Sequence, residues 1–279
     1  MAIILDGRTV ALKIRADVKV KASRLSAKPG LAAILVGDDP ASKLYVEMKE
    51  KACDEAGFYS QKIILPEHTS QEDLLYHIDT LNMDDRIHGI LVQLPLPKHI
   101  SPHALFSSID KDKDVDGFSP YNMGELMAGK ETLVAATPKG VVRLLEEYKI
   151  PFIGKEVVIA NHSTVVGKPL AMLFLNRQAT VTVCHVNTKD LASHTRQADI
   201  LVSATGVPNL IRAGMVKDGA VVVDVGINKQ DGTTAGDVDF EPVSKKASYI
   251  SPVPGGVGPM TIAMLLENTL QAASRILSR

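Results

Sequence analysis

Three residues with hydrogen-bonding or titratable groups share one face of an expected helix over 42–56. Ser42, Tyr45 and Lys49 stand three and seven positions apart, which brings a hydroxyl, a phenol and an ammonium to the same side. A lysine held beside apolar walls is poorly hydrated, so its pKa falls and proton transfer near neutral pH becomes feasible. From the spacing alone, a solvated lysine on an amphipathic helix is the simpler interpretation.

Gln93 stands near the end of an apolar run over 87–94 that stops at Pro95-Leu96-Pro97. The carboxyl end of a strand is where open α/β sheets bind ligands, and a carboxamide there can both donate and accept a hydrogen bond. The alternative is that Gln93 only satisfies the backbone around it.

Acidic residues alternate in one segment that contains Asp110, Asp112, Asp114 and Asp116. The pattern begins like a calcium loop, but the position of the required bidentate Glu, counted from Asp112, is Met123. The calcium interpretation therefore fails, and we predict no metal site. An inward-facing Asp116 could accept two N–H groups of an amino-heterocycle, whereas Asp110 and Asp112 are better explained as solvated surface acids.

Prolines and glycines fill the segment 252–259, immediately before an expected helix over 261–270. Glycines let the backbone approach a ligand closely, and prolines fix the path of the chain. A flexible interdomain linker is the alternative, although it would not need so many prolines.

The strand-to-helix turn over 158–167 does not match G-x-G-x-x-G, and only Gly167 lies at a helix entrance where phosphate could meet backbone N–H groups. After the next strand, the run 184–187 has neither the acid expected at an NAD ribose nor the Arg expected at an NADP phosphate. His162, His185 and Lys189 could supply positive charge there, although lone histidines are more often structural.

The elements that must position these residues alternate along the whole chain, as is typical of α/β architecture with buried parallel strands. We expect strands over 31–36, 62–65, 87–94, 156–160, 181–184, 200–204 and 221–225. We expect helices over 42–56, 71–81, 168–176 and 190–198, and a further one starting at Thr137-Pro138. The short spacing of the later elements predicts a doubly wound nucleotide-binding sheet.

Composition narrows the class of partner. The 279 residues carry a formal net charge of −1, so no bulk field recruits nucleic acid or an anionic membrane. Aromatic residues make up only 4%, which leaves few stacking platforms for bases. The two cysteines provide no disulfide framework and no paired zinc spacing, and no apolar run is long enough to span a membrane. We therefore expect a cytoplasmic protein with a small-molecule partner.

Taken together, the motifs resemble the bifunctional methylenetetrahydrofolate dehydrogenase/methenyltetrahydrofolate cyclohydrolase family. They appear in the family's order and cover nearly the whole chain. They are Tyr45-Val46-x-x-Lys49-x-Lys51, Val92-Gln93-Leu94-Pro95-Leu96-Pro97, Lys113-Asp114-Val115-Asp116-Gly117-Phe118, Thr137-Pro138-x-Gly140, Ser163-x-x-Val166-Gly167-Lys168-Pro169, Asp224-Val225-Gly226-Ile227-Asn228 and Pro254-Gly255-Gly256-Val257-Gly258-Pro259.

The resemblance implies an α/β protein with a folate-binding catalytic domain over 1–137 plus 262–279 and a doubly wound, Rossmann-like NAD(P)-binding domain over 138–261. It also implies a homodimer, folate in the cleft, and NADP as cofactor with NAD as an alternative. The reaction would oxidise 5,10-methylenetetrahydrofolate by hydride transfer and hydrolyse 5,10-methenyltetrahydrofolate to the 10-formyl form.

The resemblance also assigns roles to individual residues. Lys49 would be the central catalytic group, hydrogen-bonded to Gln93. Tyr45 would pack against the pterin and help position the lysine, and Asp116 would hold the pterin's amino-pyrimidinone edge. The folate site would also include the backbone of Gly255, Gly256 and Val257. The cofactor site would comprise Thr137, Asn161, His162, Ser163, Val186, Gly206 and Ile227.

Two departures concern recognition of the 2′-phosphate of NADP. Asn161-His162-Ser163 replaces the family's common Gly-Arg-Ser, and Val186 stands where a Ser or a basic residue often occurs. Exchanging Arg for His removes a permanent charge and makes the remaining attraction pH-dependent. We predict weaker NADP binding than is usual in the family, or a relaxed NADP/NAD preference.

Three other functions remain as alternatives. One is a monofunctional cyclohydrolase whose dehydrogenase activity is lost or shifted to NAD. Another is a hydroxy-acid dehydrogenase, which would need an Arg placed for a carboxylate, and no such motif is evident. The third is a folate- or nucleotide-binding module without turnover, which would not need a proton-transfer lysine.

Overall fold

The computed structural model describes residues 1–230 and 233–279, which form two compact units. Unit 1 contains Met1–Leu12 and Thr137–Thr261, and unit 2 contains Lys13–Ala136 and Ile262–Arg279. Within the described residues, no helix has the length and apolar character needed to cross a membrane.

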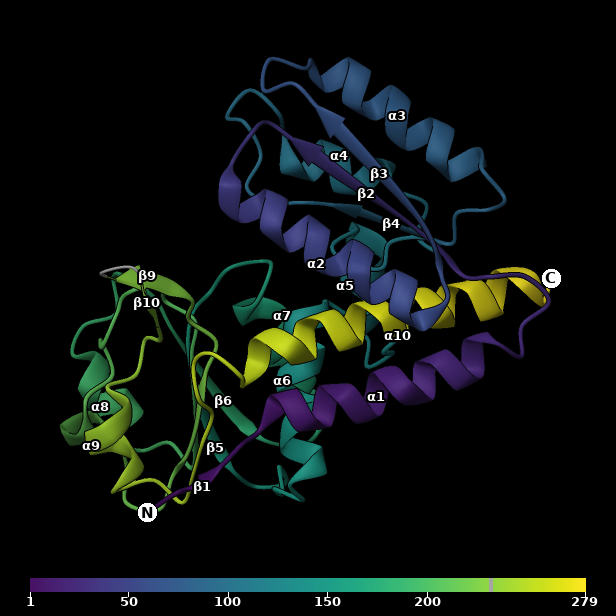
Figure 1. Ribbon diagram of the computed structural model, residues 1–279. Coiled ribbons are helices and arrows are strands. Elements are labelled where there is room, and N and C mark those ends of the chain that lie inside the picture. Colours follow the sequence, from purple (N-terminus) through teal and green to yellow (C-terminus); the bar gives the residue numbers. More distant parts are fainter. Residues whose placement is uncertain (231–232) are drawn as a thin grey trace. The chain divides into compact units, whose positions relative to one another are not determined.

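Unit 2 is built on a parallel sheet with the strand order β3-β2-β4 (Figure 1). The strands are β2 (Gly30–Val36), β3 (Tyr59–Leu65) and β4 (Gly89–Val92). Every residue of β2 and β4 is buried, because helices cover both faces of the sheet. Helix α2 (Pro40–Ala56) lies on one face, and α3 (Gln71–Met83) and α4 (Pro102–Ser108) lie on the other.

The helix starts of unit 2 follow directly from the sequence. Asp39 caps α2 by accepting a hydrogen bond from the backbone N–H of Ser42, and Pro40 follows it. Ser-Pro pairs start α4 and α5 (Pro120–Met127) in the same way. Gly57 ends α2 with a φ of 78°, a left-handed conformation that favours glycine.

The helix α10 (Val257–Leu277) begins in unit 1 and continues in unit 2. In its unit 2 part, the fully buried Asn268 donates to the carbonyl oxygens of Val115, at 2.8 Å, and Val134, at 2.7 Å. These two bonds fasten the segment that carries Asp116. The helix α1 (Gly7–Ala22) likewise has residues in both units.

Unit 1 is a six-stranded parallel sheet with the order β1-β11-β8-β7-β5-β6. Its strands are β1 (Ile3–Ile4), β5 (Glu156–Ala160), β6 (Thr180–Cys184), β7 (Ile200–Ser203), β8 (Val221–Asp224) and β11 (Tyr249–Ile250). The chain adds β6 on one side of β5 and then returns to place β7 on the other. Open α/β sheets bind ligands beyond the carboxyl ends of their strands at such a reversal.

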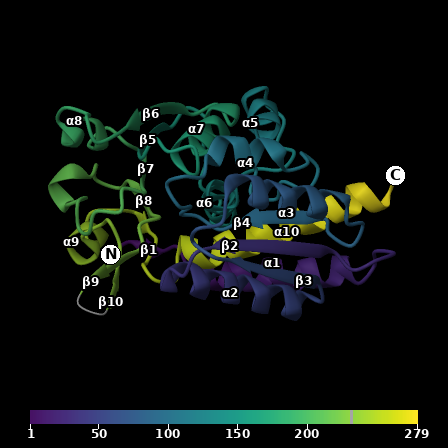
Figure 2. The same cartoon turned by 90° about the horizontal axis from the view of Figure 1, so that it is seen from above.

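Helices flank both faces of this sheet, which confirms the doubly wound architecture (Figures 1 and 2). Helices α6 (Ala136–Glu147) and α7 (Gly167–Asn176) lie on one face, and α8 (Leu191–Thr195) and α9 (Phe240–Ser244) lie on the other. A short hairpin of β9 (Asn228–Gln230) and β10 (Thr233–Ala235) and a 3₁₀ turn, η1 (Ala213–Met215), complete the unit.

The structure differs from the sequence-based expectations at several places. The first twelve residues, expected in the N-terminal domain, belong to unit 1, because β1 pairs with β11 through Ile3 and Tyr249. Two residues are too short a run to show the alternation that predicts a strand. The strand expected over 87–94 is only four residues long, and α8 ends earlier than the helix expected over 190–198.

Candidate active site

Lys49 and Gln93, which are far apart in the sequence, meet in unit 2. Lys49 Nζ donates to Gln93 Oε1 at 2.9 Å. The amide is itself held in place, since its Nε2 donates to the Leu94 carbonyl oxygen at 2.7 Å. Helix α2 supplies the lysine, and the end of β4 supplies the amide, as expected for a ligand-binding strand end.

Asp116 is the third member of this cluster, and its charge interacts with that of Lys49. Burial lowers the pKa of Lys49, and the Asp116 charge opposes that change. Burial also raises the pKa of Asp116 to about 7, against the opposing effect of Lys49. Both pKa values are therefore shifted toward neutrality, which suits a pair that exchanges a proton with a substrate.

The neighbouring Asp114 behaves differently, although it is only two residues away. It is fully buried and accepts hydrogen bonds from the backbone N–H groups of Phe118 and Ser119 and from Asn122 Nδ2. These bonds fold the segment after Asp116 into the start of α5. Among the described residues, Asp116 accepts no hydrogen bond of this kind, so its carboxylate remains available.

Tyr45 lies one helical turn before Lys49 and is half-buried, which raises the pKa of its phenol. The neighbouring apolar residues of this helix differ in exposure. Leu44 and Met48 are 55% and 44% exposed, whereas Ala52 and Cys53, which follow Lys49 by about one turn, are buried.

In unit 1, the turn between β5 and α7 is organised by the side chain of Asn161. Its Oδ1 accepts hydrogen bonds from the backbone N–H groups of Ser163, at 2.8 Å, and Gly167, at 2.9 Å. Its Nδ2 donates to the Ala204 carbonyl oxygen at 2.6 Å. The N–H of Gly167, expected to be open to a phosphate, is thus already engaged. A Cβ at Gly167 would lie 2.1 Å from the Asn161 carbonyl oxygen, so the turn requires glycine.

Two histidines come together beyond the ends of β5 and β6. The ring centroids of His162 and His185 are 5.1 Å apart, and both side chains are exposed. The next residue, Val186, is 92% exposed. Paired imidazoles can attract an anion when protonated, and this edge of a doubly wound sheet is where the adenosine half of a dinucleotide binds. The residues present therefore fit a dinucleotide with a 2′-phosphate.

Comparisons with known proteins agree with this geometry. Residues 5–116 match the family model of the tetrahydrofolate dehydrogenase/cyclohydrolase catalytic domain, and residues 135–277 match that of its NAD(P)-binding domain. Bifunctional protein FolD of Methanosarcina barkeri is 57% identical over 97% of this chain and 96% of its own length.

The chain belongs to the tetrahydrofolate dehydrogenase/cyclohydrolase family.

Solved structures of this family have the same fold. The FolD methylenetetrahydrofolate dehydrogenase/cyclohydrolase of Campylobacter jejuni has a TM-score of 0.97 at 52% identity and covers 99% of both chains. The FolD of Trypanosoma brucei, solved with NADP cofactor and inhibitor, has a TM-score of 0.94 at 39% identity and covers 98% of both chains. The two-domain α/β fold expected from the sequence is confirmed.

The residues expected from the family resemblance separate into two groups. Tyr45, Lys49, Gln93 and Asp116 all lie in unit 2. The remaining ones lie in unit 1: Thr137, Asn161, His162, Ser163, Val186, Gly206, Ile227, Gly255, Gly256 and Val257. In unit 1, Ile227 is 51% exposed and Gly206 has a φ of 72°. Thr137 Oγ1 lies 3.0 Å from Thr261 Oγ1.

The glycine pair of the 252–259 segment has a packing role in unit 1. Gly255 has a φ of 112°, and its carbonyl oxygen accepts a hydrogen bond from the N–H of Arg8. A Cβ at Gly7 would lie 1.8 Å from the Gly256 carbonyl oxygen. The backbone thus closely approaches the start of α1, and its contact with folate stays a prediction.

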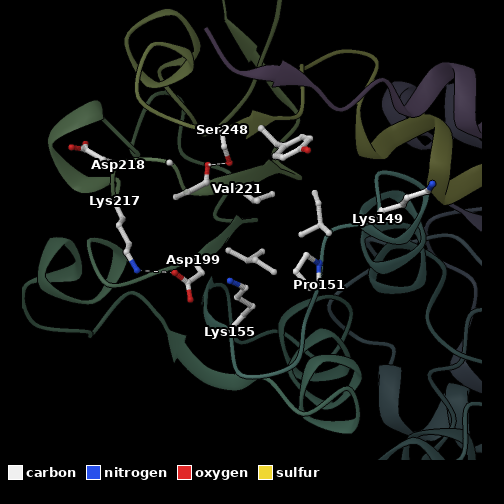
Figure 3. A pocket seen from close by; sticks show the side chains of 13 residues that line it. Lys149, Pro151, Lys155, Asp199, Lys217, Asp218, Val221 and Ser248 are labelled. Carbon is white, nitrogen blue, oxygen red and sulfur yellow. Dashed lines mark hydrogen bonds and ion pairs between the residues drawn. The ribbon is translucent and has the colours of Figure 1, made fainter.

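A separate cavity of about 220 Å³ opens at the amino ends of the unit 1 strands (Figure 3). Asp199 accepts a bond from Lys217 at 2.7 Å there, and Ser248, Lys149 and Lys155 lie around the rim. Parallel sheets bind their ligands at the opposite ends of the strands. The Asp199 carboxylate in this cavity is already paired with Lys217, and the cavity lies at the wrong ends of the strands for a cofactor. This cavity is therefore not the cofactor site.

Some residues that shape the sites were not singled out from the sequence. Asn268, Asp224 and Asp237 are buried polar residues whose partners are distant in the chain. Asp224 is the first residue of the motif Asp224-Val225-Gly226-Ile227-Asn228, but the spacing of residues in the sequence does not predict its buried contacts. A buried Asn in an apolar helix was the only sequence signal for Asn268.

Proposed function

We propose that this protein oxidises 5,10-methylenetetrahydrofolate with NADP and hydrolyses the resulting 5,10-methenyltetrahydrofolate to 10-formyltetrahydrofolate. The observation that carries the proposal is the 2.9 Å bond between Lys49 and Gln93 beside Asp116, in a chain of this family. That cluster places a proton-transfer group of lowered pKa at the carboxyl end of a strand.

For hydrolysis, Lys49 acts first as a base and then as an acid. Desolvation lowers its pKa, which favours the neutral amine that can take a proton from water. The bond to Gln93 Oε1 uses one N–H and fixes the direction of the lone pair. The oxygen of the deprotonated water attacks the methenyl carbon. The protonated lysine then returns its proton to the leaving nitrogen of the folate, whose bond to this carbon breaks, and the second proton of the water is released as the formyl C=O forms.

Asp116 and Tyr45 position the substrate in this proposal. A carboxylate accepts two hydrogen bonds side by side, which matches the amino-pyrimidinone edge of a pterin. The absence of competing donors at Asp116 among the described residues supports this role. The half-buried Tyr45 ring offers a face for the pterin one turn away from Lys49.

For the oxidation, bound NADP supplies a hydride acceptor. We propose that His162 and His185 attract its 2′-phosphate, since their rings lie 5.1 Å apart beyond the strands that bind the adenosine half. Gly206 and Ile227 follow β7 and β8, and with Thr137 they provide the surface for the remainder of the dinucleotide. Because histidine lacks the permanent charge and the five donors of arginine, NADP binding is weaker than is usual in the family and NAD becomes a competitor.

The test gives the purified protein 5,10-methylenetetrahydrofolate with NADP and, separately, with NAD, and follows the absorbance of methenyltetrahydrofolate and reduced nicotinamide. Turnover with NADP, followed by loss of the methenyl signal, supports both activities. Turnover only with NAD would correct the cofactor. Hydrolysis of added methenyltetrahydrofolate without any dehydrogenation would identify a monofunctional cyclohydrolase, and no turnover at all would favour a binding module.

We also propose that the protein is a cytoplasmic homodimer. Strand β6 is an edge strand of the unit 1 sheet, and Val183 and the nearby Leu175 are 37% and 47% exposed. An open edge of this kind can pair with a second copy. Cys53 and Cys184 are free and buried, which fits a reducing compartment. Sedimentation of wild type and Val183→Lys tests the dimer: a monomeric wild type would contradict it.

A further inference from the structure

Two buried carboxylates of unit 1 have no counter-ion among the described residues. Asp237 is fully buried and Asp224 is 3% exposed. Burying an unpaired carboxylate is costly, so it persists only where many donors surround it. Burial raises the pKa of Asp224 to about 6, although backbone hydrogen bonds act in the opposite direction. The donors around each carboxylate therefore show which segments the pair holds.

Asp237 joins the two loops that follow β7 and β8. Its Oδ2 accepts hydrogen bonds from Ser203 Oγ at 3.0 Å, from the Thr205 N–H at 2.5 Å and from Thr205 Oγ1 at 2.9 Å. Its Oδ1 accepts a bond from Asn228 Nδ2 at 3.1 Å. One side chain thus holds the loop 203–207 after β7 and the loop 224–228 after β8.

Within the part of the chain that the structure describes, the carboxylate of Asp224 accepts hydrogen bonds from backbone N–H groups alone. Its Oδ1 accepts from Gly226 at 2.9 Å and from Asp237 at 3.1 Å, and its Oδ2 accepts from Val238 at 2.9 Å. Asp224 therefore folds its own loop and also fixes the backbone of Asp237.

Two glycines make this arrangement reciprocal. A Cβ at Gly226 would lie 2.0 Å from Asp237 Oδ1, and a Cβ at Gly236 would lie 2.0 Å from Asp224 Oδ2. Each carboxylate thus occupies the space that a side chain on the other segment would fill. Neither can move away easily, because three or more hydrogen bonds hold each one.

The two loops lie where the second half of a dinucleotide binds. The adenosine half belongs to the β5 and β6 side, where His162 and His185 meet, so the nicotinamide half belongs to the β7 and β8 side. Gly206 and the exposed Ile227 stand on these loops.

We infer that Asp224 and Asp237 are positioning residues that fix the loops 203–207 and 224–228 against the nicotinamide half of the dinucleotide. They touch neither the cofactor nor the reacting atoms, and they act through the backbone they hold. The inference rests on the proposed function, because it requires a dinucleotide on unit 1.

The two residues differ in how well an amide can replace them. Both carboxylate oxygens of Asp224 accept hydrogen bonds from backbone N–H groups. In Asp224→Asn, the new NH₂ group therefore faces an N–H donor in either orientation of the amide, and no hydrogen bond can form there. In Asp237→Asn, the amide of Asn228 can rotate and present its oxygen, so the bond is recovered. The ordering of the two variants is therefore part of the test.

We expect Asp224→Asn to lower the kcat of dehydrogenation about tenfold to a hundredfold, because a small displacement of a reacting group has that effect. Asp237→Asn should lower the kcat of dehydrogenation by a smaller factor. The Kd for NADP should rise less than kcat falls, since the adenosine half keeps its contacts. Hydrolysis of added methenyltetrahydrofolate depends on Lys49 in unit 2 and should stay within about twofold of wild type.

The matched control is Asp199→Asn, the same exchange at the opposite ends of the same strands. Both of its activities should stay within about twofold of wild type. Amide hydrogen exchange of the cofactor-free protein gives a readout independent of activity. The Thr205 N–H bonds Asp237 and not residue 224, so its faster exchange in Asp224→Asn would show that the two loops are coupled.

The inference is wrong if Asp224→Asn keeps wild-type dehydrogenation, or if both activities fall in the same proportion in both variants, which would indicate general loss of folding. A wild type without dehydrogenase activity would refute the proposed oxidation instead. In that case, unchanged Thr205 exchange in Asp224→Asn would still refute the inference.

Discussion

The two units use buried carboxylates in opposite ways. In unit 2, Asp116 has no hydrogen-bond donor among the described residues and interacts with the charge of Lys49. In unit 1, Asp224 and Asp237 accept three and four hydrogen bonds and shape the backbone around them. The number of donors around a buried acid thus distinguishes a group free to act on a substrate from one that holds a loop.

The same contrast occurs within one short segment of unit 2. Among the described residues, Asp114 accepts three hydrogen bonds from the residues that begin α5, whereas Asp116 accepts none and its charge interacts with that of Lys49. Asp114 and Asp116, two acids of one motif, therefore have different roles.

The largest effect is expected for Lys49→Met. Removal of a general acid-base group should lower the cyclohydrolase kcat about a hundredfold to ten-thousandfold, with the fold retained. Lys43→Met, on the same helix with its side chain 43% exposed, is the matched control. Steady-state hydrolysis of methenyltetrahydrofolate measures both. Full hydrolytic activity in Lys49→Met would mean that Lys49 is not the acid-base group and that unit 2 does not supply the proton transfer.

Asp114→Ala should destabilise the protein more than any change at the neighbouring surface acids. It leaves three buried donors without an acceptor, which costs about 2–4 kcal/mol of unfolding free energy. The exposed Asp110→Ala should cost about 0.5 kcal/mol or less. Urea unfolding compares the two. Equal stability of both variants would mean that Asp114 is not the structural acid of this segment.

The pH dependence of hydrolysis should change in Asp116→Asn. The Asp116 charge raises the pKa of Lys49, so its removal lowers that pKa further. Hydrolysis rises with pH as the lysine loses its proton, and the rising limb of kcat should therefore move to lower pH. Asp112→Asn should leave the limb in place. A shift of the limb to higher pH in Asp116→Asn would contradict the assigned sign.

The smallest effect is expected at the exposed histidine pair of unit 1. His162→Arg restores a permanent charge, so NADP affinity should rise about fivefold and depend less on pH, while NAD affinity stays the same. His103→Arg, an exposed site of unit 2, is the matched control. Kd values for both cofactors at pH of about 6 and 8 measure the change. Equal gains for NADP and NAD would exclude contact with the 2′-phosphate.

The side-chain site of unit 2 could be predicted well from the sequence. Helical spacing predicted that Tyr45 and Lys49 share one face, and the end of an apolar run put Gln93 at the end of a strand. The bond between Lys49 and Gln93 was expected only from the family resemblance, and the structure contains it. The doubly wound sheet followed from buried runs at short intervals. These signals are local, and each is visible within about twenty residues.

The hydrogen bonds between side chains and backbone that shape the loops of unit 1 could not be predicted in the same way. Asn161 and Asp237 bind backbone groups that lie 43 and 32 positions away. No periodicity reports such contacts, because they depend on the order of strands in the sheet. For the same reason, Gly167 seemed open to phosphate, although the Asn161 side chain occupies its N–H.

The pairing of β1 with β11 also has a consequence for synthesis of the chain. Ile3 and Ile4 leave the ribosome well before their partners Tyr249 and Ile250 are made. At usual elongation rates this strand waits for roughly 10–50 s without a partner. The outermost strand position of the sheet can therefore be filled only after residue 250 has been made, and chains that stop before residue 249 lack it.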